Sequence, residues 1–180
     1  MSAAQPSLTP EFVVAYRDMM LMGLSNEMQT TRKVLAAVPD NKREYRPDPN
    51  ARCAWELATH IANVDVQFAD GIADLKFVME SEANQAQTAS ELAASYEKEF
   101  TRAINRIRAM TPEQLLTPID FYGVFNLPAV MYLGFLNNHS IHHRGQLSSY
   151  LRPMGSKCPS IYGGSYDEPW QGQETASSAA

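Results

Sequence analysis

The sequence predicts an all-α protein, a four-helix bundle built as a single domain. Four long stretches repeat apolar residues at helical spacing, and the residues between them are rich in proline, glycine and charge. A chain of 180 residues is long enough for one buried core and short for two. We expect a disordered N-terminus over 1–8, the bundle over 9–166 and a disordered tail over 167–180.

The first predicted helix begins at Pro10 and ends before Pro39. Thr9 can cap its N-terminus, Pro10 suits the first helical position, and Glu11 places an acid in the first turn. Proline disfavours helical backbone in the residue before it, which sets the end near Pro39. Residues 38–50 carry three prolines and many charges, so they predict a connecting loop.

The second predicted helix starts with Asn50 as its cap and runs to about Gly71. Residues 72–87 are mixed and polar, and we expect them to be helical at first and then looped. His60 falls on the apolar face of the second helix, where a histidine is usually part of the core. That apolar stripe consists of Leu57, Ile61, Val64 and Phe68.

The third predicted helix spans about residues 90–110 and follows a capping box made by Thr88 and Glu91. Residues 111–114 begin a short extra turn. Residues 118–126 contain several aromatic and β-branched residues interrupted by a glycine, so they predict a short extended strap or hairpin across one end of the bundle.

The fourth predicted helix starts near Asn126 and Pro128 and runs to Leu151, where Arg152-Pro153 and Gly155 stop it. The residues on its inward face are Tyr132, Leu136, His139, His143, Leu147 and Tyr150. The following residues form an irregular C-terminal tail with too much proline and glycine for a regular element. We expect part of this tail, with Ile161 and Tyr162, to pack back onto the bundle.

Three of the four histidines lie within residues 137–147. His139 and His143 are four residues apart, so on a helix both side chains leave the same face and can share one ligand. His60 could close a three-histidine metal site, and the pair favours this role over a plain core histidine. His142 is rotated by about 100° from His143 and is expected on the surface or behind a ligand. Asp65 is interpreted as a surface acid or an acid behind a ligand, and as a weak candidate base.

Three neutral imidazoles around a divalent ion leave a coordination position for water or substrate. Such a position can lower the pKa of bound water, polarise a carbonyl or stabilise a thiolate. Imidazole suits several transition metals, of which zinc or nickel is our first expectation and iron or manganese the second. The sequence contains no zinc-protease motif, no Gly-rich phosphate loop, no nucleophile elbow and no cysteine pair.

Charge and composition exclude several classes of partner. The formal net charge is -5 and no basic run appears, so the footprint of a nucleic-acid binder is missing. The most apolar run, over residues 127–136, is far shorter than the ~18 residues that a membrane span needs. Cys53 and Cys158 stand alone, and no secretory apolar segment opens the chain, so we expect a cytoplasmic protein with reduced thiols.

Two motifs resemble the DinB/YfiT-like metalloenzyme family. Residues 139–146, His-Ser-Ile-His-His-Arg-Gly-Gln, with Tyr-Leu-Arg at 150–152 and Gly155, are similar to the family's terminal-helix motif. Residues 55–61, Trp-Glu-Leu-Ala-Thr-His-Ile, match the second-helix motif. The resemblance covers about residues 10–166. It implies an up-down-down-up bundle, a divalent metal on His60, His139 and His143, and often a homodimer.

The resemblance also suggests a reaction. Characterised relatives include S-transferases that use bacillithiol and isomerases that use mycothiol, in which the metal activates a low-molecular-weight thiol. Our leading hypothesis is therefore thiol transfer to a small electrophilic substrate, with Arg144 or Tyr162 as candidate catalytic helpers. A salt bridge at the surface or bundle end is an equally good interpretation of Arg144. Two alternatives stay open: hydrolysis by metal-bound water, and a non-catalytic stress-response bundle that binds a metal or a small molecule.

Overall fold

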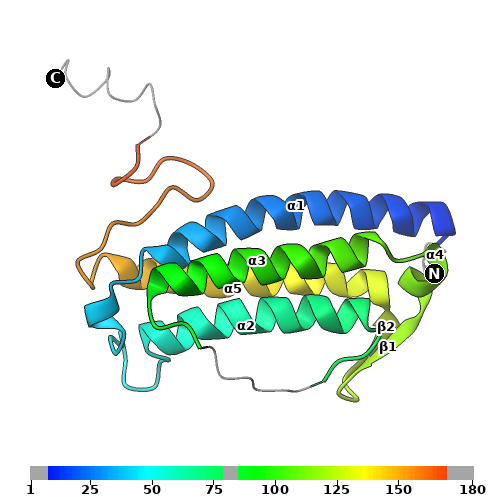
Figure 1. The fold of residues 1–180 in the computed structure, drawn as a ribbon, viewed down its shortest axis with the longest axis horizontal. Helices are drawn as coiled ribbons and strands as arrows, with labels where there is room; N and C mark the ends of the chain where they lie inside the picture. Colours follow the sequence, from blue (N-terminus) through cyan, green and yellow to red (C-terminus); the bar gives the residue numbers. More distant parts are fainter. Residues whose placement is uncertain (1–7, 79–84, 170–180) are drawn as a thin grey trace, which may run out of the picture.

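Four long helices pack side by side in the computed structural model, which describes residues 8–78 and 85–169 (Figure 1). They are α1 (Pro10–Ala36), α2 (Ala54–Ala73), α3 (Ala89–Arg108) and α5 (Tyr132–Leu151). A short helix, α4 (Pro112–Leu116), and a short 3-10 turn, η1 (Asp40–Lys42), lie in the connections. The predicted all-α four-helix bundle is confirmed.

The order of the helices around the bundle decides which side chains can meet. α1 packs against α3 and α5, and α2 packs against the same two helices, so α1 and α2 are diagonal. α2 and α3 are parallel, because Asp65 contacts Tyr96 and Asp70 contacts Arg102 farther along both helices. α1 and α5 run the opposite way (Figure 1). The up-down-down-up order that the family resemblance implied is therefore present, and it makes α2 and α5 antiparallel neighbours.

The core lies between the four helices, each of which turns one apolar face inward. Tyr96, Phe100, Tyr132 and Leu136 are among its largest side chains, and none of them is more than 2% exposed. The outward faces carry most of the charged side chains, although α1 also exposes Phe12, Met19 and Met22. Within the described ranges no helix is both long enough and apolar enough to cross a bilayer.

The start of α1 agrees with the sequence prediction. Thr9 Oγ1 accepts a hydrogen bond from the Phe12 amide at 3.2 Å, and Pro10 occupies the first helical position. The last turn of the helix ends at Ala36, shortly before Pro39. Local capping chemistry and proline therefore determine both ends of α1.

The start of α2 differs from the prediction, because Cys53 and not Asn50 caps the helix. The Cys53 sulfur accepts from the Glu56 amide at 3.4 Å, and the Glu56 carboxylate accepts from the Cys53 amide at 2.7 Å. Asn50 lies in a turn and donates its backbone N–H to Asp48 at 2.8 Å. The reciprocal pair with Glu56 satisfies two backbone donors, which an asparagine three residues upstream does not. Cysteine is an uncommon cap, and the sequence prediction passed over it.

The third helix starts as predicted, with one change in its cap. Thr88 Oγ1 accepts from the Glu91 amide at 3.1 Å, but the Glu91 carboxylate accepts from Gln87 and not from Thr88. The predicted capping box is thus half formed. The expected extra turn after α3 is α4, where Thr111 and Gln114 make the complete reciprocal pair.

The predicted strap is a two-stranded antiparallel hairpin at the end of the bundle where α5 begins (Figure 1). Its strands are β1 (Pro118–Phe121) and β2 (Phe125–Pro128), joined by a turn in which Tyr122 and Gly123 have positive φ. Because residues 125–128 pair as a strand and η2 (Ala129–Met131) follows, the last helix begins at Tyr132, later than predicted.

The chain beyond α5 is irregular, as predicted, and Gly155 ends the helix with a φ of 81°. Ile161 packs against the core, and so does Leu8 at the other terminus. Asp167 accepts from the Cys158 amide at 2.9 Å and from the Arg152 guanidinium at 3.0 Å. Leu8 and Asp167 therefore make these contacts although they lie in the predicted disordered ends, 1–8 and 167–180, whose disorder stays a prediction. The remaining parts of those predicted ends, 1–7 and 170–180, lie outside the described residues.

The α2 cap leads to a prediction about stability. Cys53→Ala removes the side-chain acceptor and should lower the free energy of unfolding by about 1 kcal/mol. Asn50→Ala should change it by less than about 0.5 kcal/mol, because the Asn50 side chain is not the cap. Chemical denaturation of both variants measures the difference. An Asn50→Ala loss equal to or greater than the Cys53→Ala loss would contradict the observed cap.

Candidate metal centre

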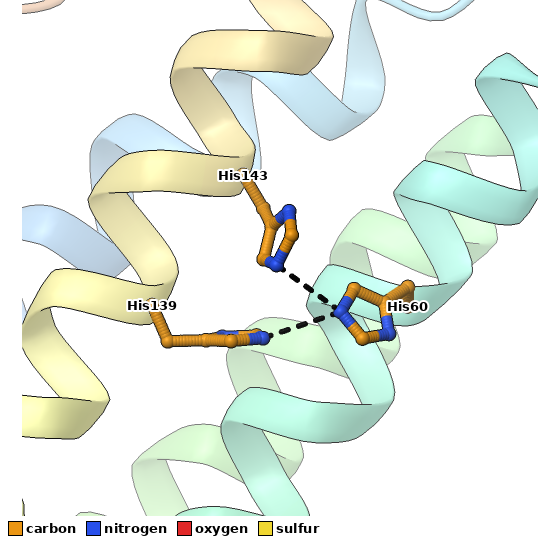
Figure 2. A group of neighbouring side chains, drawn as sticks. All are labelled: His60, His139 and His143. Carbon is orange, nitrogen blue, oxygen red and sulfur yellow. Dashed lines mark hydrogen bonds between the residues drawn. The ribbon is translucent and has the colours of Figure 1, made fainter. Parts of the chain in front are cut away.

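His60, His139 and His143 meet at the line of contact between α2 and α5, which we call the α2–α5 seam. His139 and His143 are one turn apart on α5, and His60 faces them from α2 (Figure 2). Because the two helices are antiparallel neighbours, residues about eighty positions apart in the chain come together here. The structure thus brings together the three histidines that the sequence analysis selected.

The distances between the imidazole nitrogens fit one shared ion. His60 Nε2 lies 3.3 Å from His143 Nε2 and 3.3 Å from His139 Nε2. One ligand atom from each of the three side chains falls within 4.8 Å of the other two. Two ligands of a tetrahedral zinc ion, each at about 2.0–2.1 Å from the metal, lie roughly 3.3 Å apart. The three imidazoles therefore fit a divalent transition-metal ion.

A buried carboxylate lies behind His139. Asp65 is fully buried, and its Oδ1 is 2.9 Å from His139 Nδ1. The hydroxyl of Tyr96 on α3 donates to the other carboxylate oxygen at 3.1 Å. A carboxylate accepts, so His139 carries its proton on Nδ1 and directs the lone pair of Nε2 toward the other histidines. Asp65 is therefore not a surface acid. Its position five residues after His60 turns its side chain toward the core, where it contacts His139 of α5.

Gln146 has the equivalent role for His143. Its side-chain oxygen lies 2.8 Å from His143 Nδ1 and accepts the proton there. The Nε2 lone pairs of His139 and His143 therefore both point at His60 Nε2 (Figure 2). A single N–H on His60 cannot make two strong hydrogen bonds, whereas one cation accepts all three lone pairs. This arrangement is typical of a metal site and unusual for a packed histidine cluster.

The environment keeps the imidazoles of His60 and His143 neutral, which is the form that binds metals. Burial lowers the pKa of His60 to about 4, and the positive charge of Arg52 contributes to the same shift. Burial also lowers the pKa of His143, partly opposed by the hydrogen bond to Gln146. Both rings are therefore neutral at neutral pH, and no proton has to leave them when a cation binds.

The other predicted site residues lie elsewhere. His142 is exposed, as expected, and its ring centroid is 4.8 Å from that of His143. Arg144 is 1% exposed and forms an ion pair with Glu27 of α1. The Tyr162 hydroxyl accepts from Arg144 and donates to Glu27 at 2.8 Å. The structure brings Arg144 and Tyr162 together on the side of α5 that faces α1, and a catalytic role for either stays a prediction.

The sequence analysis overlooked two residues near the histidines. Tyr96 was given no role at the site, although its hydroxyl donates a hydrogen bond to Asp65. Arg52 was not considered, although its charge acts on His60 and His143. No spacing within one helix signals either contact, because the partners lie on different elements. The sequence signals are weak: Tyr96 lies at an apolar-face position of the third helix, and Asp65 is an acid on the second helix.

A separate cleft lies between α2 and α3, on another face of α2. Asp70, Asp74, Arg102 and Arg106 line it and are already joined in ion pairs. Tyr96 forms part of the wall, so its ring lies between this cleft and the buried Asp65. The histidines are not among the residues that line the cleft, which is therefore distinct from the candidate metal centre.

Comparisons with known proteins identify a family and several relatives. A model of the DinB family matches residues 16–175. The uncharacterized Bacillus subtilis protein YrdA is 26% identical over 148 residues, which cover 79% of this chain and 85% of YrdA. The uncharacterized Bacillus subtilis protein YjoA is 27% identical over 128 residues, which cover 69% of this chain and 82% of YjoA.

Two solved structures share the fold. A DinB-like protein from Bacillus cereus superposes with a TM-score of 0.69 at 27% identity, covering 81% of this chain and 97% of that one. The crystal structure of YjoA superposes with a TM-score of 0.67 at 23% identity, covering 79% of this chain and 97% of that one.

The Asp65 contact leads to a second prediction. Asp65→Asn keeps the size of the side chain but can present an N–H to His139, so the ring loses its fixed orientation and charge partner. We expect the affinity for zinc to fall by about 10–100-fold, measured by competition with a chromophoric chelator. Asp70→Asn is the control, since Asp70 pairs with Arg102 and Arg106 on α3. Unchanged zinc affinity in a folded Asp65→Asn protein would show that Asp65 does not position the ligand.

Proposed function

This chain belongs to the DinB family, and from that premise we propose that it is a metal-dependent enzyme whose divalent ion is held by His60, His139 and His143. The observation that carries the proposal is the convergence of three imidazole nitrogens at the α2–α5 seam. Three protein ligands are typical of catalytic sites, whereas structural zinc sites normally use four. The position left by the protein is where a substrate atom would bind.

The reaction that we propose first is transfer of a low-molecular-weight thiol to an electrophilic carbon. The thiol gives its proton to water, its sulfur forms a bond to the carbon, and the leaving group departs with the electron pair of the bond that breaks. When bound, a divalent ion would supply a positive charge that favours the thiolate over the thiol at neutral pH. The chain itself orients two of the three rings, His139 through Asp65 and His143 through Gln146. It also keeps them partly buried, which strengthens electrostatic interactions at the open position.

Two other functions of the same site would give different results in an assay. A hydrolase would turn over an ester or amide without any thiol, and a non-catalytic bundle would bind metal without turnover. The homodimer and the cytoplasmic location remain predictions. α1 exposes Phe12, Met19 and Met22, apolar side chains that a second subunit could cover.

Substitution of two neighbouring histidines, His143 and His142, tests the metal centre itself. Wild-type protein should bind one divalent ion per chain, and His143→Ala should weaken binding by more than about 100-fold, because it removes a ligand. His142→Ala is the matched control, since His142 is exposed one position away. Metal content after dialysis and titration measures both. Equal metal content in the two variants would refute the proposed ligands.

The same proteins test the reaction. Metal-loaded wild type and His142→Ala should accelerate the conjugation of bacillithiol, mycothiol or glutathione to monochlorobimane, and His143→Ala should not. The control is each thiol with the free metal ion. If metal-loaded wild type reacts no faster than this control with every thiol, thiol transfer is rejected, but the proposed metal site is retained. Thiol-independent ester hydrolysis would favour the hydrolase.

A further inference from the structure

Arg52 lies at one end of the α2–α5 seam, next to the candidate metal centre. Its backbone oxygen accepts a hydrogen bond from the Tyr150 hydroxyl at 3.4 Å. Tyr150 is on α5, two turns beyond His143, and Arg52 lies just before the first turn of α2. Two turns correspond to about 10 Å along a helix. An extended arginine side chain covers a large part of that distance.

The guanidinium of Arg52 is available to a ligand. Arg43 and Arg46, at the same end of the bundle, pair with Asp40 and Glu56. Arg52 is exposed, and within residues 8–78 and 85–169 no carboxylate pairs with it. Its position just before α2 and its contact with Tyr150 of α5 place it on the same seam as the histidines. Arg52 is therefore an unneutralised cation at one end of that seam.

The local charges favour a ligand with two negative groups. The three imidazoles are neutral as ligands, and the buried Asp65 contributes one negative charge. A divalent ion and Arg52 together contribute three positive charges, so an excess of two remains beside the open position. A ligand that brings a thiolate to the metal and a carboxylate to Arg52 would balance that excess.

We propose that Arg52 binds a carboxylate of the substrate, and that the site is specific for small thiols carrying a carboxylate. The inference rests on the proposed metal-dependent thiol chemistry and adds the class of thiol to it. Arginine suits this role because its planar guanidinium can bind a carboxylate through two parallel hydrogen bonds. A neutral thiol of the same length would bind the metal alone.

Cobalt(II) in place of the native metal makes ligand binding visible without turnover. Full-length cobalt-loaded protein is titrated with mercaptoacetate, mercaptopropionate and mercaptohexanoate, and with the mercaptoalcohols of equal length. Sulfur-to-cobalt charge-transfer absorption reports the binding. We expect the best mercaptocarboxylate to bind at least about tenfold tighter than its alcohol, the ratio for one charge-assisted contact. Arg52→Gln should remove this preference, so that each mercaptocarboxylate and its alcohol bind with similar affinity.

A matched control and a sulfur-free pair of ligands complete the experiment. Lys42→Gln changes the net charge equally at the same end of the bundle and should keep the preference. Succinate should perturb the cobalt spectrum more strongly than butyrate in wild type, and equally in Arg52→Gln.

The outcomes separate this inference from the proposed function. The role of Arg52 is overturned if wild type and Arg52→Gln prefer mercaptocarboxylates equally. It is also overturned if wild type shows no preference for mercaptocarboxylates over mercaptoalcohols. Failure to bind cobalt overturns the metal site and the inference with it. An Arg52-dependent preference for succinate without a thiol absorption band rejects thiol chemistry and keeps the anion-binding role.

Discussion

The candidate site depends on the register between α2 and α5. A shift of one residue along either helix would turn His60 away from His139 and His143, because neighbouring helical positions differ by about 100°. Asp65 helps to hold this register, since it lies on α2, accepts from His139 on α5 and accepts from Tyr96 on α3. One buried carboxylate thus joins three of the four long helices at the level of the metal ligands.

The burial of the Asp65 carboxylate is better explained by function than by the stability of the bundle. A fully buried Asp costs several kcal/mol unless its oxygens are bonded and a positive charge lies nearby. Both Asp65 oxygens have hydrogen-bond partners, in His139 and Tyr96. A cation bound on the far side of the His139 imidazole would place a positive charge near this carboxylate. An apolar residue at this position would pack the bundle at lower cost, so the acid is best explained by the metal centre that it supports.

Much of the fold, and the placement of His139 and His143 on one face, could be predicted because the information is local. Helical periodicity identified four long helices, and the four-residue spacing of His139 and His143 placed both on one face. The errors arose where a partner was remote or unusual. Asn50 looked like a cap, whereas Cys53 has the reciprocal partner in Glu56. Arg144 does form one of the two predicted contacts, an ion pair, but the guanidinium is buried and its partner is Glu27 on α1. The Cys53 cap is local but uses an unusual residue, whereas no pattern within a single helix reveals the contact between Arg144 and Glu27.

The most direct test of the account is the position of a bound metal. A crystal of the zinc-loaded protein, measured on both sides of the zinc absorption edge, locates the ion by anomalous scattering. The account predicts one strong peak at about 2.0–2.1 Å from the Nε2 atoms of all three histidines, His60, His139 and His143. A peak that contacts fewer than three of these nitrogens, or that lies at another place in the bundle, would contradict it.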